Sequence, residues 1–336
     1  MQVGDGKSAY KIRAASLAAG FPATTTASSL DRFCASGLKA VQDVANQIMA
    51  GDIEIGLVVG GESMTNSPPP PDPLPEEIMA NKDAADCAQP MIQTSENVST
   101  EFNISRHHQD QYAAESFRRA EVAQKAGWFD DEIVPIDATV LDSAGHRTTI
   151  VITRDEGPRY NTTVESLSKL KPAMPQFGTH TTAGNASQTT DGVEAAAILL
   201  MKRSKALELG QPVLGKYCGA AVAGVSPRIM GTGPVVAIPK LLQRFRLSQE
   251  DVDIIEINEA FASMAVYCQR ALGLDHEKLN PRGGAIAIGH PLGATGARQI
   301  CTILSEARRV RKQILVTSMC VGSGQGMAGL FVNEKL

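Results

Sequence analysis

Along this chain, stretches with apolar residues at helical spacing alternate with short apolar runs that have the length of strands. The clearest helix places Leu38, Val41, Ala45 and Ile48 on one face, and Gly51 ends it. Further helices are expected over residues 8–19, 106–126, 235–246, 259–272 and 295–309. Strands are expected over residues 24–30, 53–59, 132–136, 193–201, 213–218, 252–257, 284–288, 314–319 and 328–332. This alternation predicts an α/β protein with a parallel sheet covered by helices.

Residues 66–190 break this pattern. Prolines at 68–71 and 73 predict a stiff exposed turn, and Gly, Thr and Ser dominate residues 178–190. We interpret the whole stretch as a loop domain that is inserted into the first half and covers a site. The predicted divisions are residues 1–65 with 191–210 for the first half, 66–190 for the loop domain and 211–336 for the second half.

The two halves share an order of elements, which indicates an internal repeat. Residues 8–64 and 259–326 each predict a helix, a strand, a sharp corner, a helix, a strand and a Gly-rich turn. The repeat matches Cys34 with His290, and two such halves facing each other would bring the corners together. Residues 213–257 have no counterpart in the first half, so we expect a chain that is cut short at its N-terminus.

Cys34 is the first candidate for chemistry. The predicted strand 24–30 leads to this cysteine, and Ser36 and Gly37 form the corner at which the next helix begins. The dipole and the free N–H groups at a helix start favour an anion, which would bias the thiol toward its nucleophilic thiolate. The alternative is a small thiol packed beneath the helix, as many buried cysteines are.

Other candidates follow the predicted strands of the second half. His290 could remove the proton of a nucleophilic thiol, and Cys320 ends a neighbouring strand. The backbone of Gly322 could approach a ligand, and Asn258 could stabilise an oxyanion or cap a helix. Each has an ordinary alternative as a loop histidine, a core cysteine, a turn glycine or a helix cap. Their position at the same ends of parallel strands favours a shared site, because ligands bind at carboxyl ends of such strands.

Composition narrows the function classes. The chain has 336 residues, 43% apolar and 20% charged, with a net charge of −4, so we expect a globular protein without a nucleic-acid footprint. No apolar run is long enough to cross a membrane. The six cysteines form no C-x-x-C pair, which argues against zinc clusters and disulfides and favours a reducing compartment. The adjacent His107 and His108 point in different directions on a helix, so a metal site there is disfavoured.

The sequence resembles the thiolase family, most closely its peroxisomal 3-ketoacyl-CoA type, over nearly the whole chain. The segments that carry the resemblance are 34–38 (Cys-Ala-Ser-Gly-Leu), 60–64 (Gly-Gly-Glu-Ser-Met), 182–187 (Thr-Ala-Gly-Asn-Ala-Ser), 230–234 (Met-Gly-Thr-Gly-Pro), 258–261 (Asn-Glu-Ala-Phe), 280–293 (Asn-Pro-Arg-Gly-Gly-Ala-Ile-Ala-Ile-Gly-His-Pro-Leu-Gly) and 320–324 (Cys-Val-Gly-Ser-Gly). The resemblance implies a thiolase-like α/β fold with two similar βαβ-repeat halves, α/β/α/β/α layers and an inserted loop domain.

The resemblance also implies a reaction. Cys34, deprotonated by His290, would attack the keto carbonyl of a 3-ketoacyl-CoA, and Cys320 would protonate the departing acetyl-CoA enolate. Coenzyme A would then take the acyl group from Cys34, or the steps would run in reverse as a Claisen condensation. One oxyanion hole would use His290 with a water held by Asn258, and the other the backbone N–H groups of Cys34 and Gly322.

Further implications concern binding and assembly. The resemblance implies coenzyme A contacts at Met91, Ser187 and Gly219, no metal, a homodimer and a peroxisomal location, with cytoplasm or mitochondria as alternatives. Asp31 stands where the family usually has Asn, and a negative charge there would disfavour a thiolate on Cys34. Phe33 replaces a small or polar residue, and Gly219 replaces a serine. A first half without its first strands would expose an apolar sheet face.

Two rival functions stay open at this point. A ketoacyl-synthase-like condensing enzyme shares the fold and the nucleophilic cysteine, but it would need histidine where Cys320 stands. A catalytically impaired thiolase that acts only as a dimer partner is the second rival. An isolated-chain melt and an acyl-transfer assay would separate these possibilities.

Overall fold

The computed structural model describes residues 8–65, 74–141 and 145–334, so the predicted proline turn at 68–73 lies outside the described residues. Two sheets carry the site. β1 and β4 form an antiparallel pair, and the larger sheet has the order β5-β8-β7-β6, with β6 and β7 parallel and the other neighbours antiparallel. The strands are β1 (Ile55–Ser63), β2 (Ile136–Leu141), β3 (Arg147–Ile152), β4 (Asp191–Met201), β5 (Gly215–Gly224), β6 (Ile254–Ile257), β7 (Ile314–Val321) and β8 (Gln325–Asn333).

All of the predicted helices are present near their expected bounds. The helices are α1 (Ser8–Ala18), α2 (Ser36–Ala50), α3 (Glu76–Met79), α4 (Lys82–Asp86), α5 (Met91–Glu101), α6 (Arg106–Lys125), α7 (Val164–Ser168), α8 (Arg203–Glu208), α9 (Gly233–Phe245), α10 (Ala262–Leu272), α11 (Ala285–Ile288) and α12 (Leu292–Val310), with 3₁₀ turns η1 (Phe33–Ala35) and η2 (Pro227–Thr232). Gly51 ends α2 with a left-handed φ of 87°, as the sequence predicts.

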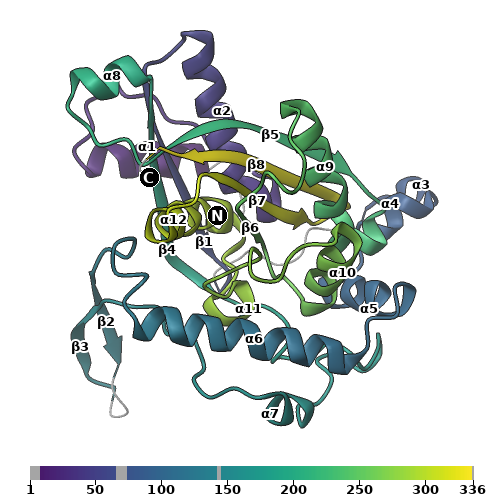
Figure 1. Cartoon of the computed structure of the whole chain (residues 1–336). Helices are drawn as coiled ribbons and strands as arrows, with labels where there is room; N and C mark the ends of the chain where they lie inside the picture. The colour runs from purple at the N-terminus through teal and green to yellow at the C-terminus, as the bar shows by residue number, and fades with distance from the viewer. Residues whose placement is uncertain (1–7, 66–73, 142–144, 335–336) are drawn as a thin grey trace.

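The described elements stack in layers. α2 and α12 lie between the β1–β4 pair and the larger sheet, while α9 covers the opposite face of the larger sheet. In Figure 1, α12 stands near the middle of the molecule. One face of this helix is apolar and buried, and it carries Ala294, Ala297, Ile300 and Ile303. The middle layer therefore carries the contacts that join the two halves.

α2 and α12 touch through their backbones at their N-terminal turns. A Cβ atom built on Gly37 would come within 2.6 Å of the Ala297 nitrogen, and one on Gly296 would collide with the Leu38 backbone. Only glycine permits so close an approach. Because Cys34 precedes α2 and His290 precedes α12, this contact brings the two corners together.

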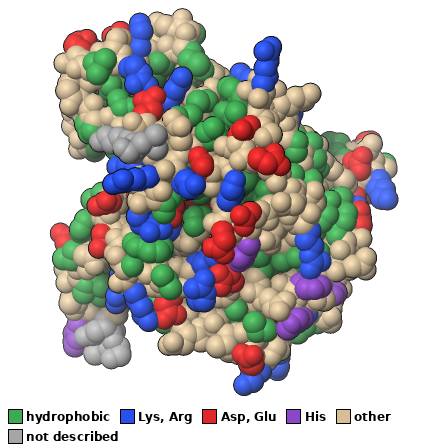
Figure 2. Space-filling view, in the orientation of Figure 1, with side chains coloured by type: hydrophobic (Ala, Val, Ile, Leu, Met, Phe, Trp, Pro, Cys, Tyr) green, Lys and Arg blue, Asp and Glu red, His purple; other side chains and the backbone are tan. Residues whose placement is uncertain are grey.

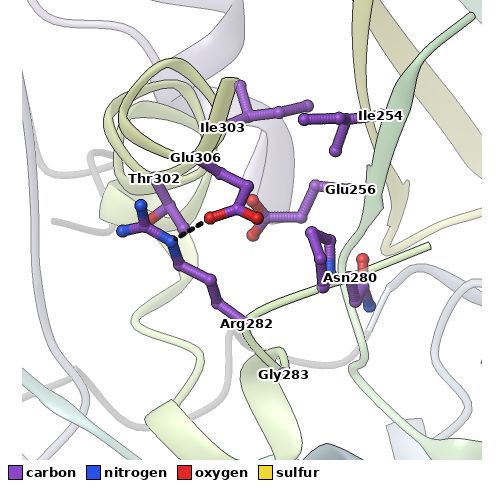
Figure 3. A pocket seen from close by; sticks show the side chains of 9 residues that line it. Ile254, Glu256, Asn280, Arg282, Gly283, Thr302, Ile303 and Glu306 are labelled. Atoms are coloured by element: carbon purple, nitrogen blue, oxygen red, sulfur yellow. Dashed lines mark hydrogen bonds and ion pairs between the residues drawn. The ribbon is translucent and has the colours of Figure 1, made fainter. Parts of the chain in front are cut away.

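The segment that leads to His290 is tied to α12 by a buried ion pair. Arg282 is 2% exposed, and its Nε lies 2.8 Å from Glu306 Oε2. Figure 3 shows this guanidinium pointing toward the carboxylate across a small pocket lined by Glu256, Thr302 and their neighbours. Removal of one partner of such a buried pair typically costs about 3–5 kcal/mol. Arg282 thus holds the 280–284 segment in place.

The loop region lies on one side of the sheets. α6 runs across the lower part of Figure 1, above α7, and the β2–β3 hairpin projects at the lower left. Buried Glu259 links this region to the second half, because it accepts hydrogen bonds from Ser116 of α6 (2.6 Å), Asn280 (2.8 Å) and the Ile286 nitrogen (3.2 Å). The carboxylate therefore fixes α6 and α11 relative to the strand that precedes Asn258.

Several predictions about strands were wrong. Residues 24–30 and 284–288 are not strands: the first forms turns and irregular chain, and the second contains α11. A short apolar run becomes a strand only where a partner strand is available, and periodicity cannot show that. The strand expected at 132–136 begins instead at Ile136. The larger sheet is mixed, not parallel, with only β6 and β7 parallel.

The surface carries mixed charges and an exposed apolar sheet face. On the face in Figure 2, acidic and basic side chains are interspersed, without a broad field of one sign. The β1–β4 pair exposes the apolar side chains of Ile55, Leu57, Val59 and Leu199. Within the described ranges, no helix has both the length and the apolar character needed to span a membrane.

Candidate active site

Cys34 lies in the turn η1 directly before α2, as predicted. The turn is held by side chains, because Asp31 Oδ1 accepts from the Phe33 nitrogen (2.6 Å) and Ser36 Oγ accepts from the Arg32 nitrogen (2.8 Å). Phe33 has a left-handed φ of 48°, which is costly for an aromatic residue. Strain of this kind persists where neighbours fix the backbone, as the hydrogen bonds of Asp31 and Ser36 do here.

The Cys34 thiol faces an imidazole. Cys34 Sγ lies 3.2 Å from His290 Nε2, and both side chains are buried. Burial raises the pKa of Cys34 to about 12, against the hydrogen bond from the Gly322 backbone; Glu62 and Asp31 raise it further. Burial also lowers the pKa of His290 to about 3. The resting pair is therefore a neutral thiol beside a neutral base.

This result corrects one expectation. The helix start predicts a bias of Cys34 toward the thiolate, but desolvation of the buried thiol raises its pKa by more than the backbone N–H groups of Gly322 and Cys34 lower it. The expected effect of Asp31 has the predicted sign, since its charge raises the pKa of Cys34. Cys34 therefore needs a base at the moment it reacts, and His290 is in position to serve.

His290 follows Gly289 and precedes α12, and polar groups contact its backbone nitrogen and both of its ring nitrogens. Its backbone nitrogen donates to Thr190 Oγ1 (3.1 Å), and its Nδ1 lies 2.7 Å from Thr295 Oγ1. Its Nε2 lies 3.2 Å from Asn258 Nδ2 as well as from Cys34. The ring is thus held at both nitrogens.

Cys320 lies on β7, fully buried and beside Cys34. Its charge would interact with that of Cys34, and burial raises its pKa well above the ordinary value. Its thiol points to Met264 Sδ at 3.4 Å. Met264, Phe261, Ala260 and Met230 form with Cys320 a small apolar cluster. The structure therefore brings the second cysteine to the site of the first. Cys320 is 0% exposed and has apolar neighbours, whereas Cys34 is 7% exposed.

Gly322 and Asn258 complete the group. The Gly322 backbone donates toward the Cys34 sulfur, in line with the predicted amide donor. Asn258 directly follows β6, and its nitrogen donates to the Ser318 carbonyl on parallel β7 (2.9 Å). It does not cap a helix, because α10 begins at Ala262 with Phe261 as its cap. Among the described protein atoms its Oδ1 has no hydrogen-bond partner, so it can accept one from water or a ligand.

The predicted coenzyme A contacts separate into two groups. Ile92 and Ala186, next to Met91 and Ser187 in sequence, pack against the Cys320 cluster, so these two segments reach the site. The Ser187 nitrogen donates to the Ala260 carbonyl at 3.0 Å. Gly219 is not brought there: it lies mid-strand on β5, opposite Leu330, and a Cβ atom built on it would come within 2.6 Å of the Phe245 ring.

Sequence reasoning also missed Thr295 and Glu62 at the site. Thr295 contacts the His290 ring, and its position five residues after His290 in the first turns of α12 was an available signal. Glu62 is buried and accepts from the Gly293 nitrogen (3.2 Å). Glu62 lies within one of the segments that carry the thiolase resemblance, and a carboxylate at the end of an apolar strand is the signal that could have found it.

The arrangement defines a class of protein. A buried thiol within reach of a neutral imidazole, with amide donors beside it, is a site for acyl transfer through a cysteine thioester. Within the described residues, no cluster of His, Cys, Asp or Glu could hold a metal ion.

Comparison with known proteins identifies the family. The thiolase N-terminal domain matches residues 1–204, and the thiolase C-terminal domain matches residues 211–333. The chain belongs to the thiolase family. It is 51% identical over 331 residues to the peroxisomal 3-ketoacyl-CoA thiolase of Yarrowia lipolytica, covering 98% of this chain and 79% of that protein. It is 50% identical over 336 residues to the peroxisomal 3-ketoacyl-CoA thiolase of Saccharomyces cerevisiae, covering 98% and 77%.

Solved structures agree with this fold. The dimeric peroxisomal thiolase of Saccharomyces cerevisiae superposes with a TM-score of 0.90 at 49% identity, covering 98% of this chain and 82% of that chain. The human mitochondrial 3-ketoacyl-CoA thiolase gives a TM-score of 0.88 at 34% identity, covering 99% and 85%. The protein has the thiolase fold, as its sequence predicts.

Proposed function

We propose that this protein is a 3-ketoacyl-CoA thiolase: it cleaves a 3-ketoacyl-CoA with coenzyme A to give acetyl-CoA and a shortened acyl-CoA. The observation that carries the proposal is the buried contact of 3.2 Å between Cys34 Sγ and His290 Nε2. The names of the relatives that match nearly the whole chain support the same activity. The ketoacyl-synthase rival is disfavoured because cysteine, not histidine, stands at position 320.

The first half-reaction forms a thioester on Cys34. As the sulfur attacks the keto carbonyl, its proton moves to His290 Nε2, and the carbon–carbon bond breaks to release the enolate of acetyl-CoA. Cys320 gives its proton to the α-carbon of that enolate. The Gly322 and Cys34 backbone N–H groups stabilise the negative oxygen at one carbonyl, and His290 with an Asn258-held water does so at the other.

The second half-reaction returns the site to its starting state. Coenzyme A gives its thiol proton to the Cys320 thiolate and attacks the acyl group on Cys34. The acyl-CoA leaves, and the Cys34 sulfur recovers its proton from His290. All protons and bonds balance without a metal or a redox cofactor, and the reverse sequence is a Claisen condensation.

Residues 66–190 are proposed to form the loop domain that covers this site. Met91 and Ser187 are proposed as its coenzyme A contacts, because the residues beside them pack against the Cys320 cluster. Gly219 is left out of this set, since it packs against Phe245 within the sheet.

The protein is further proposed to be a peroxisomal homodimer. The Saccharomyces thiolase is described as dimeric, and the relatives that match nearly the whole chain are named peroxisomal. The exposed apolar face of β1 and β4 would favour association through the first half. Light scattering at micromolar concentration should give a dimer; a stable monomer would count against it.

The decisive assay for activity is thiolysis of acetoacetyl-CoA and a longer 3-ketoacyl-CoA, measured side by side. Cleavage of either substrate with release of acetyl-CoA is the expected result. A thermal melt and size-exclusion run on the same sample show whether the chain is folded. Folded protein that cleaves neither substrate would refute the proposal and favour the rival of a catalytically impaired dimer partner.

A further inference from the structure

The two nitrogens of a neutral imidazole are not equivalent. One carries a hydrogen and the other a lone pair, and only the lone pair can receive a proton from Cys34. The ring faces Cys34 through Nε2 and Thr295 through Nδ1, so the partner at Nδ1 decides whether Nε2 can act as a base.

Thr295 can accept a hydrogen bond from the imidazole ring and keep its bond to the Pro291 carbonyl, but it cannot donate to the ring and keep that bond. Its Oγ1 lies 3.1 Å from the Pro291 carbonyl one helical turn earlier, and that oxygen can only accept. The hydroxyl hydrogen is therefore donated to Pro291, as buried threonines in helices often do. Its lone pair remains for His290 Nδ1 at 2.7 Å, so Nδ1 must be the donor.

The surroundings of Nε2 agree with this orientation. Asn258 Nδ2 lies 3.2 Å from Nε2 and is a donor, so it too requires a lone pair on that nitrogen. The opposite tautomer would place N–H groups of the ring and of Asn258 face to face. It would also force the Thr295 hydroxyl to leave Pro291.

We propose that Thr295 is a positioning residue that selects the Nδ1–H tautomer of His290 and so keeps the lone pair on Nε2, the nitrogen that accepts the Cys34 proton. This inference rests on the proposed function in which His290 deprotonates Cys34. The Thr295 hydroxyl donates to the Pro291 carbonyl and accepts from His290 Nδ1, and the side chain is fully buried. Thr295 therefore acts through His290 and not on the substrate.

The direct test reads the tautomer itself. Selective ¹⁵N labelling of the six histidines, with a His290→Gln variant to assign the signal, reports which ring nitrogen of His290 carries hydrogen in the folded protein. Wild type should show Nδ1–H and an unprotonated Nε2. An Nε2–H tautomer in wild type would overturn the inference whether or not the enzyme is active.

The kinetic test uses Thr295→Val, which keeps the shape but removes the acceptor, and Thr295→Ser, which restores it. Thr295→Val should lower kcat for thiolysis about tenfold, the effect of one neutral hydrogen bond, with KM unchanged. The loss should be the same at every pH, because the two tautomers carry equal charge. Thr295→Ser should recover most of the rate.

Thr317→Val is the matched control: this threonine is equally buried on β7, and its hydroxyl has no partner among the described residues. It should keep the wild-type rate. Folded Thr295→Val with wild-type kcat, or with a shifted pH profile in place of a parallel loss, would overturn the inference. If Thr295→Val does not fold, the wild-type spectrum and Thr295→Ser decide. Inactive wild type would refute the proposed function alone.

Discussion

The two cysteines of the site, Cys34 and Cys320, differ in their position in the fold and in the residues around them. Cys34 lies at the start of α2, with a strained Phe33 before it and His290 Nε2 at 3.2 Å. Cys320 lies within β7, is 0% exposed and has Met264 Sδ as its neighbour at 3.4 Å. Burial raises the pKa of both thiols, so acidity does not separate them.

What separates them is access to a base. A buried thiol with a high pKa becomes a nucleophile only when a base takes its proton during attack, and Cys34 alone has the imidazole beside it. Cys320, in its apolar cluster, holds a proton firmly and is suited to giving it to a carbanion. The difference lies in neighbours and not in the cysteines.

The largest expected effect comes from removing the nucleophile. Cys34→Ala should abolish acyl transfer completely, because no thioester can form. The measurement is release of acetyl-CoA from acetoacetyl-CoA, together with a melt to show that the variant folds. Substantial residual thiolysis would mean that another group carries the acyl chain.

The next effect separates the second cysteine from the first. Cys320→Ala should lower thiolysis about 10²–10⁴-fold, the range for one positioned proton-transfer group. The same variant should still take an acyl group onto Cys34 from a simple acyl-CoA, detected by intact mass. Near-normal thiolysis by folded Cys320→Ala would make Cys320 a packing residue and refute its role as acid.

The sequence predicted the parts of this comparison that depend on local structure. The start of α2 just after Cys34, its end at Gly51 and the placement of Cys320 on a strand follow from spacing and capping within a few residues. Residues 24–30 and 284–288 were misassigned because a strand requires a distant partner. Protonation was also misjudged, since the burial that raises the pKa of Cys34 comes from elements far along the chain.

The contact between Cys34 and His290 was predicted from a repeat, but its cause was not visible. Gly37 and Gly296 let α2 and α12 meet at the backbone, and a glycine in a sequence does not show what it approaches. Likewise Thr295 is one of many threonines until the fold brings its hydroxyl to the His290 ring.

A smaller effect concerns pH. Because burial raises the pKa of Cys34 to about 12 and lowers that of His290 to about 3, the thiol and the base are neutral across the ordinary range. Alkylation of Cys34 by iodoacetamide should therefore rise between pH 6 and 10 without a plateau, about tenfold per unit where the free thiolate reacts. A midpoint near or below pH 7 would indicate a thiolate–imidazolium pair and contradict this account.

The smallest expected effect comes from Asp31. Its charge raises the pKa of Cys34, and Asp31→Asn removes the charge while keeping an oxygen for the Phe33 nitrogen. Alkylation of Cys34 at pH 8 should become faster, by less than about tenfold. Asp52→Asn, an exposed site beyond the end of α2, is the control. No change, or slower alkylation, would show that Asp31 does not act on the thiol through its charge.

The assignment of Cys34 as the acylated residue is tested most directly by mapping the intermediate. The protein is incubated with a simple acyl-CoA in the absence of free coenzyme A, quenched in acid and analysed by peptide mass spectrometry. A single acyl adduct is expected on the peptide that contains Cys34, and it should be lost on addition of coenzyme A. An adduct on Cys320 with Cys34 unmodified would contradict it and reverse the roles of the two cysteines.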